Sequence, residues 1–281
     1  MKSVSHSSLG RSKPAVVMLT DFGGDSFYVG ALKGAVLSVD PDATIVDLTH
    51  GIRPYSVDEG SFVLARTFGL FAEGTVYLAV VDPGVGGERK NLAFVSKGRY
   101  LVAPDNGLVS DIEVEHGIES TFSITEDAVA EIRKHRDFGQ TFLGRDVFAP
   151  AAAYLANGGP VSHLGPRIDV YETLTLPSVE YGTHLIKGSS RYVDSFGNIL
   201  TNISGSDIKR VFGNTPLAQI HISVNNTVGV DGIDDYFSRA KMGELMVILN
   251  SWNLVEISVN QGRAIDRFPD AGRIDIELTL V

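Results

Sequence analysis

The feature that most constrains the fold is a change in hydrophobic pattern past the middle of the chain. Up to about residue 160, short apolar runs alternate with segments whose apolar residues recur at helical spacing. This alternation is typical of an α/β domain with a mostly parallel sheet and helices on both faces. Beyond about Pro177, short alternating runs are separated by Gly, Asn and Asp, which predicts a smaller all-β, barrel-like domain.

We therefore expect two domains, at residues 15–176 and 182–281. In the first domain, the expected strands are 15–20, 44–49, 75–81, 92–95 and 100–103, and the expected helices are 27–40, 57–71 and 144–157. In the second domain, the expected strands are 184–192, 218–224, 244–249, 255–259 and 274–280.

Composition excludes several kinds of partner. The 281-residue chain has a formal net charge of −10 and no dense basic stripe, which argues against a nucleic-acid partner. It contains no cysteine, which excludes disulfides and thiolate sites and fits a cytoplasmic location. No apolar run is long enough to span a membrane. The first 14 residues lack the apolar core of a secretory signal and are expected to form a disordered tail.

Polar residues follow four of the expected strands. They are Asp21, the segment 47–50, Asp82 and the pair 105–106. Ligands of open α/β sheets bind outside the carboxyl ends of the strands, so these residues predict a site at one edge of the sheet. Taken singly, each of them could equally start a turn or cap a helix.

The common phosphate-binding signatures are missing. The chain has neither a G-x-G-x-x-G after its first strand nor a G-x-x-x-x-G-K-[ST] motif. A phosphate-free nucleoside remains compatible, because a carboxylate at Asp21 could accept both ribose hydroxyls. A hydrolytic metal site built from Asp21, Asp25, Asp47 and Asp82 is an alternative, opposed by the nearby charge of Arg89.

Two segments are expected to form two walls of one site. The first is VVDPGVGGER at residues 80–89, in which a glycine-rich turn separates Asp82 from Arg89. The second is TFLGRD at residues 141–146, which opens an alanine-rich helix. Charge pairing with Arg89 would favour the ionised form of Asp82. A structural salt bridge that only braces the turn is the alternative.

The chain resembles the S-adenosylmethionine hydroxide adenosyltransferase family, which is related to the bacterial fluorinase and chlorinase. The resemblance runs in matching order from about Ala15 to near the C-terminus. It is carried by TDFGGDSFYVGALKG, IVDLTHGIRPYSVDEG, VVDPGVGGER, VAPDNGLVS, TFLGRDVFAPAAA, DSFGNILTNI and NSWNLVEISVNQG. It implies a homotrimer, with each site formed between the first domain of one subunit and the second domain of a neighbour. S-adenosylmethionine is then the substrate, and no cofactor or metal is implied.

The resemblance also implies roles for single residues. Asp21 would hold the ribose hydroxyls, and Tyr55 would stack near the sugar or adenine. Thr141 and Gly144 would line the reaction centre. In the second domain, the residues implied around the methionine moiety and the adenine edge are Asp194, Phe196, Asn198, Ser251, Trp252, Arg263 and Ala264.

Hydrolytic members of the family use an Asp, Arg and His set to direct water at the 5′ carbon, which releases methionine and adenosine. Asp82 and Arg89 occupy the first two positions and are the expected catalytic residues. Leu143 occupies the histidine position, and its side chain can neither donate nor accept a hydrogen bond. We expect hydrolysis through Asp82 and Arg89. The alternatives are a 5′-halogenase, which a negative Asp82 opposes, and a catalytically weak protein that binds S-adenosylmethionine or adenosine.

Four histidines elsewhere in the chain are candidates to replace the histidine that is absent at position 143. Only His50 follows an expected strand, and we expect it to be a hydrogen-bonded loop residue. His135 lies in a charged stretch and is expected to be solvated, and neither His163 nor His184 is assigned a role.

Overall fold

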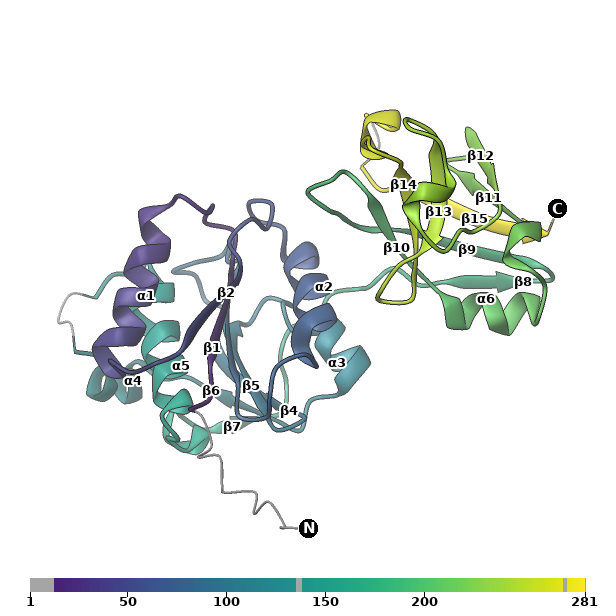
Figure 1. The fold of residues 1–281 in the computed structure, drawn as a ribbon. Coiled ribbons are helices and arrows are strands. Elements are labelled where there is room, and N and C mark those ends of the chain that lie inside the picture. Colours follow the sequence, from purple (N-terminus) through teal and green to yellow (C-terminus); the bar gives the residue numbers. More distant parts are fainter. Residues whose placement is uncertain (1–12, 135–137, 270–271, 281) are drawn as a thin grey trace, which may run out of the picture. The chain divides into compact units, whose positions relative to one another are not determined.

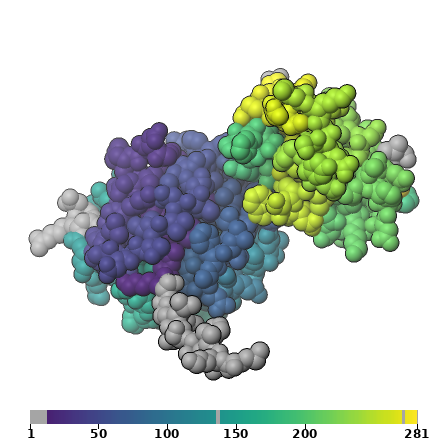
Figure 2. All heavy atoms as spheres, in the orientation of Figure 1, coloured from purple at the N-terminus to yellow at the C-terminus, as the bar shows by residue number. Residues whose placement is uncertain are grey.

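The computed structural model describes residues 13–134, 138–269 and 272–280, and Figure 1 shows its ribbon. The chain divides into two units, Met1–Leu174 and Thr175–Val281. Each unit is one continuous stretch of chain and so spans one continuous range of colour in Figure 2. The expected tail falls almost wholly on residues 1–12, which lie outside the described residues, as does His135. No helix among the described residues is long and apolar enough to cross a membrane.

The first unit is built on a seven-stranded sheet. Its strands are β1 (Val16–Thr20), β2 (Ile45–Thr49), β3 (Val76–Val80), β4 (Asn91–Ser96), β5 (Arg99–Pro104), β6 (Ser120–Ser123) and β7 (Arg167–Ile168). Their order across the sheet is β2-β1-β3-β5-β4-β6-β7. The first four strands in this order pair in parallel, whereas β4, β6 and β7 join the sheet through antiparallel pairs.

The expectation of a mostly parallel sheet is therefore confirmed only in part, because the sheet is mixed. The reason lies in the connection between β4 and β5. Only Lys97 and Gly98 link these strands, with φ angles of 46° and 69°. A two-residue turn with positive φ at both positions forms a hairpin, whereas a parallel pair needs a crossover of a dozen or more residues.

Helices cover both faces of this sheet (Figure 1). On one face lie α1 (Phe27–Val39), α4 (Glu126–Ile132) and α5 (Ala149–Ala156), and on the other lie α2 (Val57–Phe68) and α3 (Ser110–His116). Val16 and Met18 of β1 belong to the core on the first face, and Val17 and Leu19 belong to the core on the second. Burial on both faces explains why the strand is apolar from Val16 to Leu19, as expected.

The second unit is an antiparallel sheet of eight strands. They are β8 (Glu180–Gly182), β9 (Leu185–Val193), β10 (Ile199–Ser204), β11 (Ile220–Val224), β12 (Val228–Asp231), β13 (Leu245–Leu249), β14 (Leu254–Val259) and β15 (Asp275–Leu280). The order is β12-β11-β15-β9-β10-β14-β13, with β8 paired to β9. An isolated bridge joins Asp234, just past β12, to Ile248 of β13. The sheet is therefore nearly closed, and the expected barrel-like domain is confirmed.

One helix interrupts the strands of the second unit. It is α6 (Gly205–Phe212), which begins with a capping box between Ser204 and Asp207. Its buried residues, Ile208 and Phe212, belong to the core of the barrel-like sheet. An all-β description of this unit is therefore incomplete.

We expect the substitution Leu78→Ala to destabilise the first unit by about 2–5 kcal/mol, because it leaves a cavity in a core that cannot fully collapse. Leu78 of β3 is fully buried in the core beneath α1 and α5. The matched control is Leu70→Ala, at a side chain that is 74% exposed. Urea unfolding measures both variants, and equal stability of the two would contradict the assignment of the core.

Candidate active site

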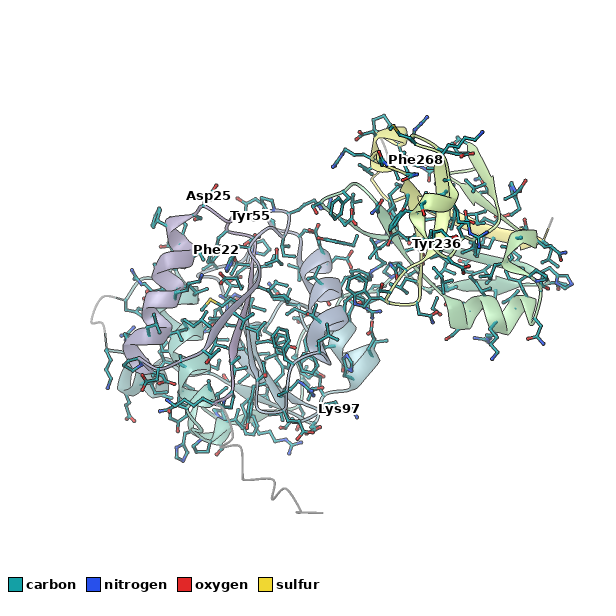
Figure 3. All side chains as sticks on the ribbon, in the orientation of Figure 1. Phe22, Asp25, Tyr55, Lys97, Tyr236 and Phe268 are labelled. Carbon is teal, nitrogen blue, oxygen red and sulfur yellow. The ribbon has the colours of Figure 1, made fainter. Side chains whose placement is uncertain are left out.

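The parallel strands end at one edge of the first unit, and the polar strand ends predicted from the sequence lie there. Figure 3 labels Phe22, Asp25 and Tyr55 at this edge. Not every strand end is available to a ligand. Asp105 is buried and accepts a hydrogen bond from the backbone N–H of Glu172 at 2.7 Å. The strand end of β5 therefore holds a later segment of the chain in place.

A pocket of about 480 Å³ lies at this edge. It brings together five residues that the sequence predicted for one site, namely Asp21, Tyr55, Asp82, Thr141 and Gly144. The complete lining is Asp21, Phe22, Tyr28, Pro54, Tyr55, Val80, Asp82, Val85, Thr141, Phe142, Leu143 and Gly144.

Asp82 is held by two parallel hydrogen bonds from Arg89. The Nε of Arg89 donates to Oδ1 of Asp82 at 2.8 Å, and Nη2 donates to Oδ2. The side chain of Asp82 is 5% exposed and that of Arg89 is 10% exposed. A bidentate pair of this kind fixes the plane of the carboxylate as well as its position. Each carboxylate oxygen keeps a second lone pair that can accept a hydrogen bond from the pocket.

Arg89 is itself anchored from behind. Its Nη1 donates to the carbonyl of Lys90 at 3.0 Å and to Oδ1 of Asn91 at 2.5 Å. Its Cζ lies 5.4 Å from the ring centroid of Phe148, within the range of a cation–π contact. Arg89 does not line the pocket, so it acts on the pocket through Asp82.

The glycine-rich turn and the TFLGRD segment approach each other closely, as the sequence analysis expected. Gly86 has a φ of +79°, and a Cβ placed on it would lie 2.8 Å from the carbonyl oxygen of Gln140. Only glycine satisfies both the backbone angle and the contact. Gln140 directly precedes Thr141, so this contact sets one wall of the pocket against the other.

The TFLGRD segment leads into a π-helical turn over Gly144–Phe148, which continues into α5. The carboxylate of Asp146 is fully buried and accepts hydrogen bonds from the backbone N–H of Gly139 at 2.9 Å and from Arg145 at 2.6 and 2.9 Å. These bonds close the loop that presents Thr141. Leu143 is 5% exposed, packs in the core beneath α1, and contributes an apolar surface to the pocket.

Asp21 directly follows β1, and its Oδ2 accepts a hydrogen bond from the backbone N–H of Tyr55 at 2.8 Å. Tyr55 has a φ of 67°, which is uncommon for a residue other than glycine, and its side chain is 73% exposed. The strand end after β1 is thus fastened to the loop before α2. The remaining lone pairs of the Asp21 carboxylate can accept further hydrogen bonds.

An aromatic wall of the pocket was missed by the sequence analysis. Ring centroids of Phe142 and Tyr28 lie 5.0 Å apart, and those of Phe142 and Phe22 lie 5.9 Å apart. Tyr28 sits in the first turn of α1, directly above the strand ends. Its place just after the helix cap Ser26 was the available signal, because side chains of a first turn face the carboxyl edge of the sheet in this architecture.

Four predicted residues of the second unit are grouped in one place. The carboxylate of Asp194 accepts hydrogen bonds from the backbone and side-chain nitrogens of Asn198 at 2.9 and 3.0 Å. Nη1 of Arg263 donates to the carbonyl of Ser195 at 3.0 Å. A pocket of about 540 Å³ in this unit is lined by Ser195, Phe196, Asn198, Phe237, Val259, Asn260, Gln261, Gly262 and Arg263.

The other three predicted residues of the second unit lie apart from this pocket. Ala264 is fully buried in the barrel core. Ser251 and Trp252 occupy the turn between β13 and β14, at the end of β14 opposite to Gln261. The backbone N–H of Trp252 donates to Oδ1 of Asn250 at 3.0 Å, which closes that turn. Their contact with a ligand stays a prediction.

Neither the histidines nor a cluster of metal-binding side chains contributes to the pocket among the described residues. Its lining, as far as the chain is described, includes no histidine. His163 lies 3.0 Å from the hydroxyl of Tyr154, and His184 occupies the turn between β8 and β9. His50 is buried and bonded to Thr20 and Asp47, as expected for a loop histidine. The described residues contain no group of three His, Cys, Asp or Glu side chains that could hold a metal ion, so the metal-site alternative has no support.

Comparisons with known proteins agree on one family. Residues 16–165 match the model of the SAM hydroxide adenosyltransferase N-terminal domain, and residues 188–269 match that of the C-terminal domain. A protein of Salinispora arenicola named (R)-S-adenosyl-L-methionine hydrolase is 33% identical, over 91% of this chain and 94% of its own. A fluorinase of Nocardia brasiliensis is 28% identical over 71% and 74%. The crystal structure of an uncharacterized conserved protein from Thermotoga maritima superposes with a TM-score of 0.86 at 33% identity, covering 94% and 99%.

We expect Gly86→Ala to destabilise the first unit by about 1–3 kcal/mol, because alanine resists the positive φ and its Cβ would meet the Gln140 carbonyl. Gly24→Ala is the matched control, since Gly24 lies in a neighbouring loop with negative φ and no atom within 4 Å of its Cβ position. Thermal unfolding compares the two variants. A Gly86 variant as stable as the control would show that the two walls do not depend on this contact.

Proposed function

The chain belongs to the S-adenosylmethionine hydroxide adenosyltransferase family, and we propose that it hydrolyses S-adenosyl-L-methionine to adenosine and L-methionine. The single observation that carries the proposal is the pocket in which Asp82, held by Arg89, faces Asp21 and the TFLGRD loop. Relatives named as hydrolases are more similar to this chain than those named as fluorinases.

The reaction is a displacement at the 5′ carbon of the substrate. An oxygen of water forms the new bond to C5′, and the bond between C5′ and sulfur breaks. Its electron pair stays on the sulfur, which leaves as the neutral thioether of methionine. One proton of the water stays on the 5′-hydroxyl of adenosine and the other is released. Because the sulfonium already carries the positive charge, no acid is needed to help it leave.

The protein contributes position to this reaction. Asp82 accepts a hydrogen bond from the attacking water, stabilises the positive charge that develops on it and can accept the proton that is released. Arg89 is a positioning residue, since its two hydrogen bonds hold the carboxylate plane and leave lone pairs directed to the pocket. Asp21 holds the ribose hydroxyls, and Tyr55 lies against the sugar or the adenine.

Leu143 affects the rate of hydrolysis rather than the binding of the substrate. A leucine gives the water no hydrogen bond, so Asp82 orients it with one partner fewer than in relatives that carry a histidine at this position. The surfaces of Leu143 and Val80 keep the reaction centre apolar. As the bond from C5′ to sulfur breaks, positive charge passes from the sulfur to the attacking water beside Asp82, and an apolar pocket strengthens the attraction of the carboxylate for that charge.

Halide use is disfavoured by charge. A carboxylate at Asp82 repels an anion across the short distance of the pocket. Its bidentate partner Arg89 lies behind it and does not line the pocket, so the charge that a halide would meet there is negative. Water is the nucleophile that this arrangement accepts.

The assembly we propose is a homotrimer in the cytoplasm. The pocket of the first unit would be completed by the second unit of a neighbouring subunit, which would bring Asp194, Phe196, Asn198 and Arg263 to the methionine and adenine. Exposed aromatic side chains on both units support this assembly, among them Tyr55 at 73% and Phe196 at 73%. Ser251, Trp252 and Ala264 would lie near the ligand and contact it through their backbone groups or support the residues that do.

The substrate can be narrowed to one sulfonium epimer. The name of the Salinispora relative specifies the R form. We therefore expect the R epimer of S-adenosyl-L-methionine to be consumed faster than the S epimer. Chromatography of a mixture of both epimers, with and without chloride and with and without a chelator, should give adenosine and methionine in equal amounts under all conditions. A halogenated nucleoside, dependence on a metal, or binding without turnover would each contradict the proposal.

We expect Asp82→Asn to lower kcat by about 10²–10³-fold, because an amide accepts a hydrogen bond but cannot take up charge from the water. KM should change little, since the ribose contacts stay intact. Asp42→Asn is the matched control, at an exposed aspartate of the turn before β2. Steady-state kinetics measures both variants, and an Asp82 variant of wild-type rate would remove this carboxylate from the mechanism.

We expect Leu143→His to raise the rate of hydrolysis by about tenfold or more, because an imidazole adds a second hydrogen bond to the water. Leu143→Met changes the shape at the same position without adding a hydrogen-bonding group, so it should not show the rise. The measurement is adenosine release at saturating substrate. No change or a fall with histidine would mean that the water is held in a different place.

A further inference from the structure

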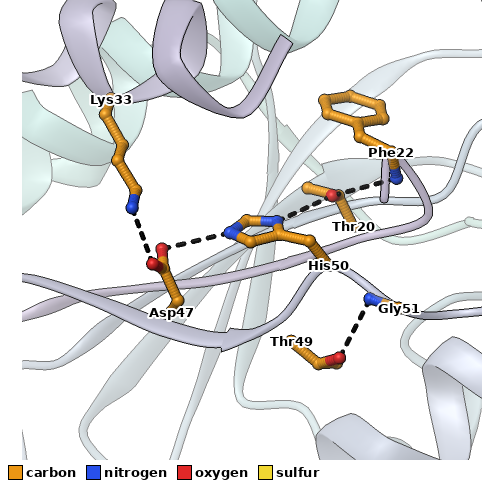
Figure 4. Close-up of polar contacts among 7 residues, drawn as sticks. All are labelled: Thr20, Phe22, Lys33, Asp47, Thr49, His50 and Gly51. Atoms are coloured by element: carbon orange, nitrogen blue, oxygen red, sulfur yellow. Dashed lines mark hydrogen bonds and ion pairs between the residues drawn. The ribbon is translucent and has the colours of Figure 1, made fainter. Parts of the chain in front are cut away.

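His50 is a buried histidine that the proposed reaction does not use. It directly follows β2, and its side chain is 6% exposed. Both ring nitrogens have a partner (Figure 4): Nδ1 lies 2.8 Å from Oγ1 of Thr20, and Nε2 lies 3.1 Å from Oδ1 of Asp47. A buried ring that is bonded on both sides has one orientation.

The direction of these hydrogen bonds follows from Asp47. Its Oδ2 accepts from Nζ of Lys33 at 2.6 Å. Burial acts to raise the pKa of Asp47, but the hydrogen bonds from Lys33 and His50 outweigh it and hold that pKa below its usual value. An ionised carboxylate only accepts, so Nε2 of His50 must carry the hydrogen between them. With its hydrogen on Nε2, a ring that lacks a second hydrogen accepts the hydroxyl hydrogen of Thr20 at Nδ1, whereas a hydrogen on both nitrogens would deprive that hydroxyl of this acceptor.

Thr20 links His50 to the pocket through hydrogen bonds. It is the fully buried last residue of β1, and its Oγ1 accepts from the backbone N–H of Phe22 at 3.2 Å. This bond spans Asp21, and Phe22 lines the pocket. On the far side, the backbone N–H of Gly23 donates to the carbonyl of His50 at 2.8 Å. The turn that holds Asp21 is therefore fastened at both ends to the His50 loop.

We propose that His50 is a positioning residue: as a neutral ring with its hydrogen on Nε2, it orients the Thr20 hydroxyl and so aims Asp21 at the 2′,3′-diol of a nucleoside. This inference rests on the proposed function, in which Asp21 holds the ribose hydroxyls. Filling the same space with an apolar side chain would avoid burying polar groups that each need a partner. The chain instead keeps a fully matched series of donors and acceptors from Lys33 to Phe22, which ends at the pocket.

The test compares the binding of adenosine and 2′,3′-dideoxyadenosine to the full chain by calorimetry. The second nucleoside lacks the diol, so the ratio of the two dissociation constants isolates the Asp21 contact from general damage to the fold. We expect the wild type to prefer adenosine by at least about 30-fold. Thr20→Val and His50→Leu should each reduce that preference at least about fivefold, while binding of the dideoxynucleoside stays within about twofold.

Two further variants separate positioning from structure. His50→Asn should recover most of the preference, because its side-chain oxygen can replace Nδ1 and accept the Thr20 hydroxyl. Thr201→Val should leave the preference unchanged. Thr201 is a matched control: it is fully buried in β10, and its Oγ1 accepts from the backbone N–H of Ile203, two residues on, at 3.1 Å.

Each result decides a separate point. Wild-type preference in both Thr20→Val and His50→Leu, or an equal loss in Thr201→Val, would overturn the positioning role. A wild type that does not prefer adenosine would instead overturn the Asp21 contact in the proposed function. Nitrogen NMR of the wild-type protein gives a readout that needs no variant: we expect His50 to carry its hydrogen on Nε2, and a hydrogen on Nδ1 alone or on both nitrogens would contradict the proposal.

Discussion

The burial of β1 and β3 on both faces is the constraint on which the rest of the first unit depends. Helices cover each face, so every side chain of these strands except Thr20 lies in one of two apolar cores. A charged group placed within such a strand would lose its water without gaining a partner. Charged residues therefore begin where the strands leave the sheet, at Asp21 and just past β3 at Asp82. Parallel strands end at the same edge, so the packing that stabilises the fold also gathers the carboxylates of the site.

Strands β1 to β5 and helices α1, α2 and α5 were predictable from their apolar patterns, whereas the short elements α3, α4, β6 and β7 were not predicted. Wholly apolar runs and helical spacing are direct consequences of two-sided burial, and β1, β2 and β3 were found within a residue or so of their observed bounds. The mixed sheet was not predicted, although the two-residue connection at Lys97 and Gly98 contained the information. α6 was missed in a similar way. Its capping box of Ser204 and Asp207 stands in the sequence, but the helix that follows is only eight residues long.

Charged residues of the site were predicted from the sequence, whereas the aromatic residues that shape the pocket were missed. Asp82 and Arg89 are separated by a turn rich in glycine, and charged residues so spaced around a turn can meet, as they do. Tyr28 and Phe142 form a wall of the pocket, yet an aromatic residue at helical spacing looks the same whether it faces a core or a ligand. Ser251 and Trp252 lie at the opposite end of β14 from the pocket of their own unit, because the extended strand runs between them and the pocket residues that follow it.

The residues proposed to bind the nucleoside differ from Asp82 and Leu143, which concern the orientation of the attacking water. In the proposed function, binding of the nucleoside depends on Asp21, on the aromatic wall and on the loop fastened by Asp146, and none of these is hydrogen-bonded through the side chain of Leu143. The displacement itself needs a water in line with the bond from C5′ to sulfur, which is a requirement of orientation. Asp82 meets it with a carboxylate whose plane is fixed by Arg89, so the geometry that survives at this site is the part held by the salt bridge. Because the sulfonium is a ready leaving group and Leu143 and Val80 make the pocket partly apolar, the proposed mechanism needs one fixed carboxylate for turnover and assigns a lower rate to the leucine.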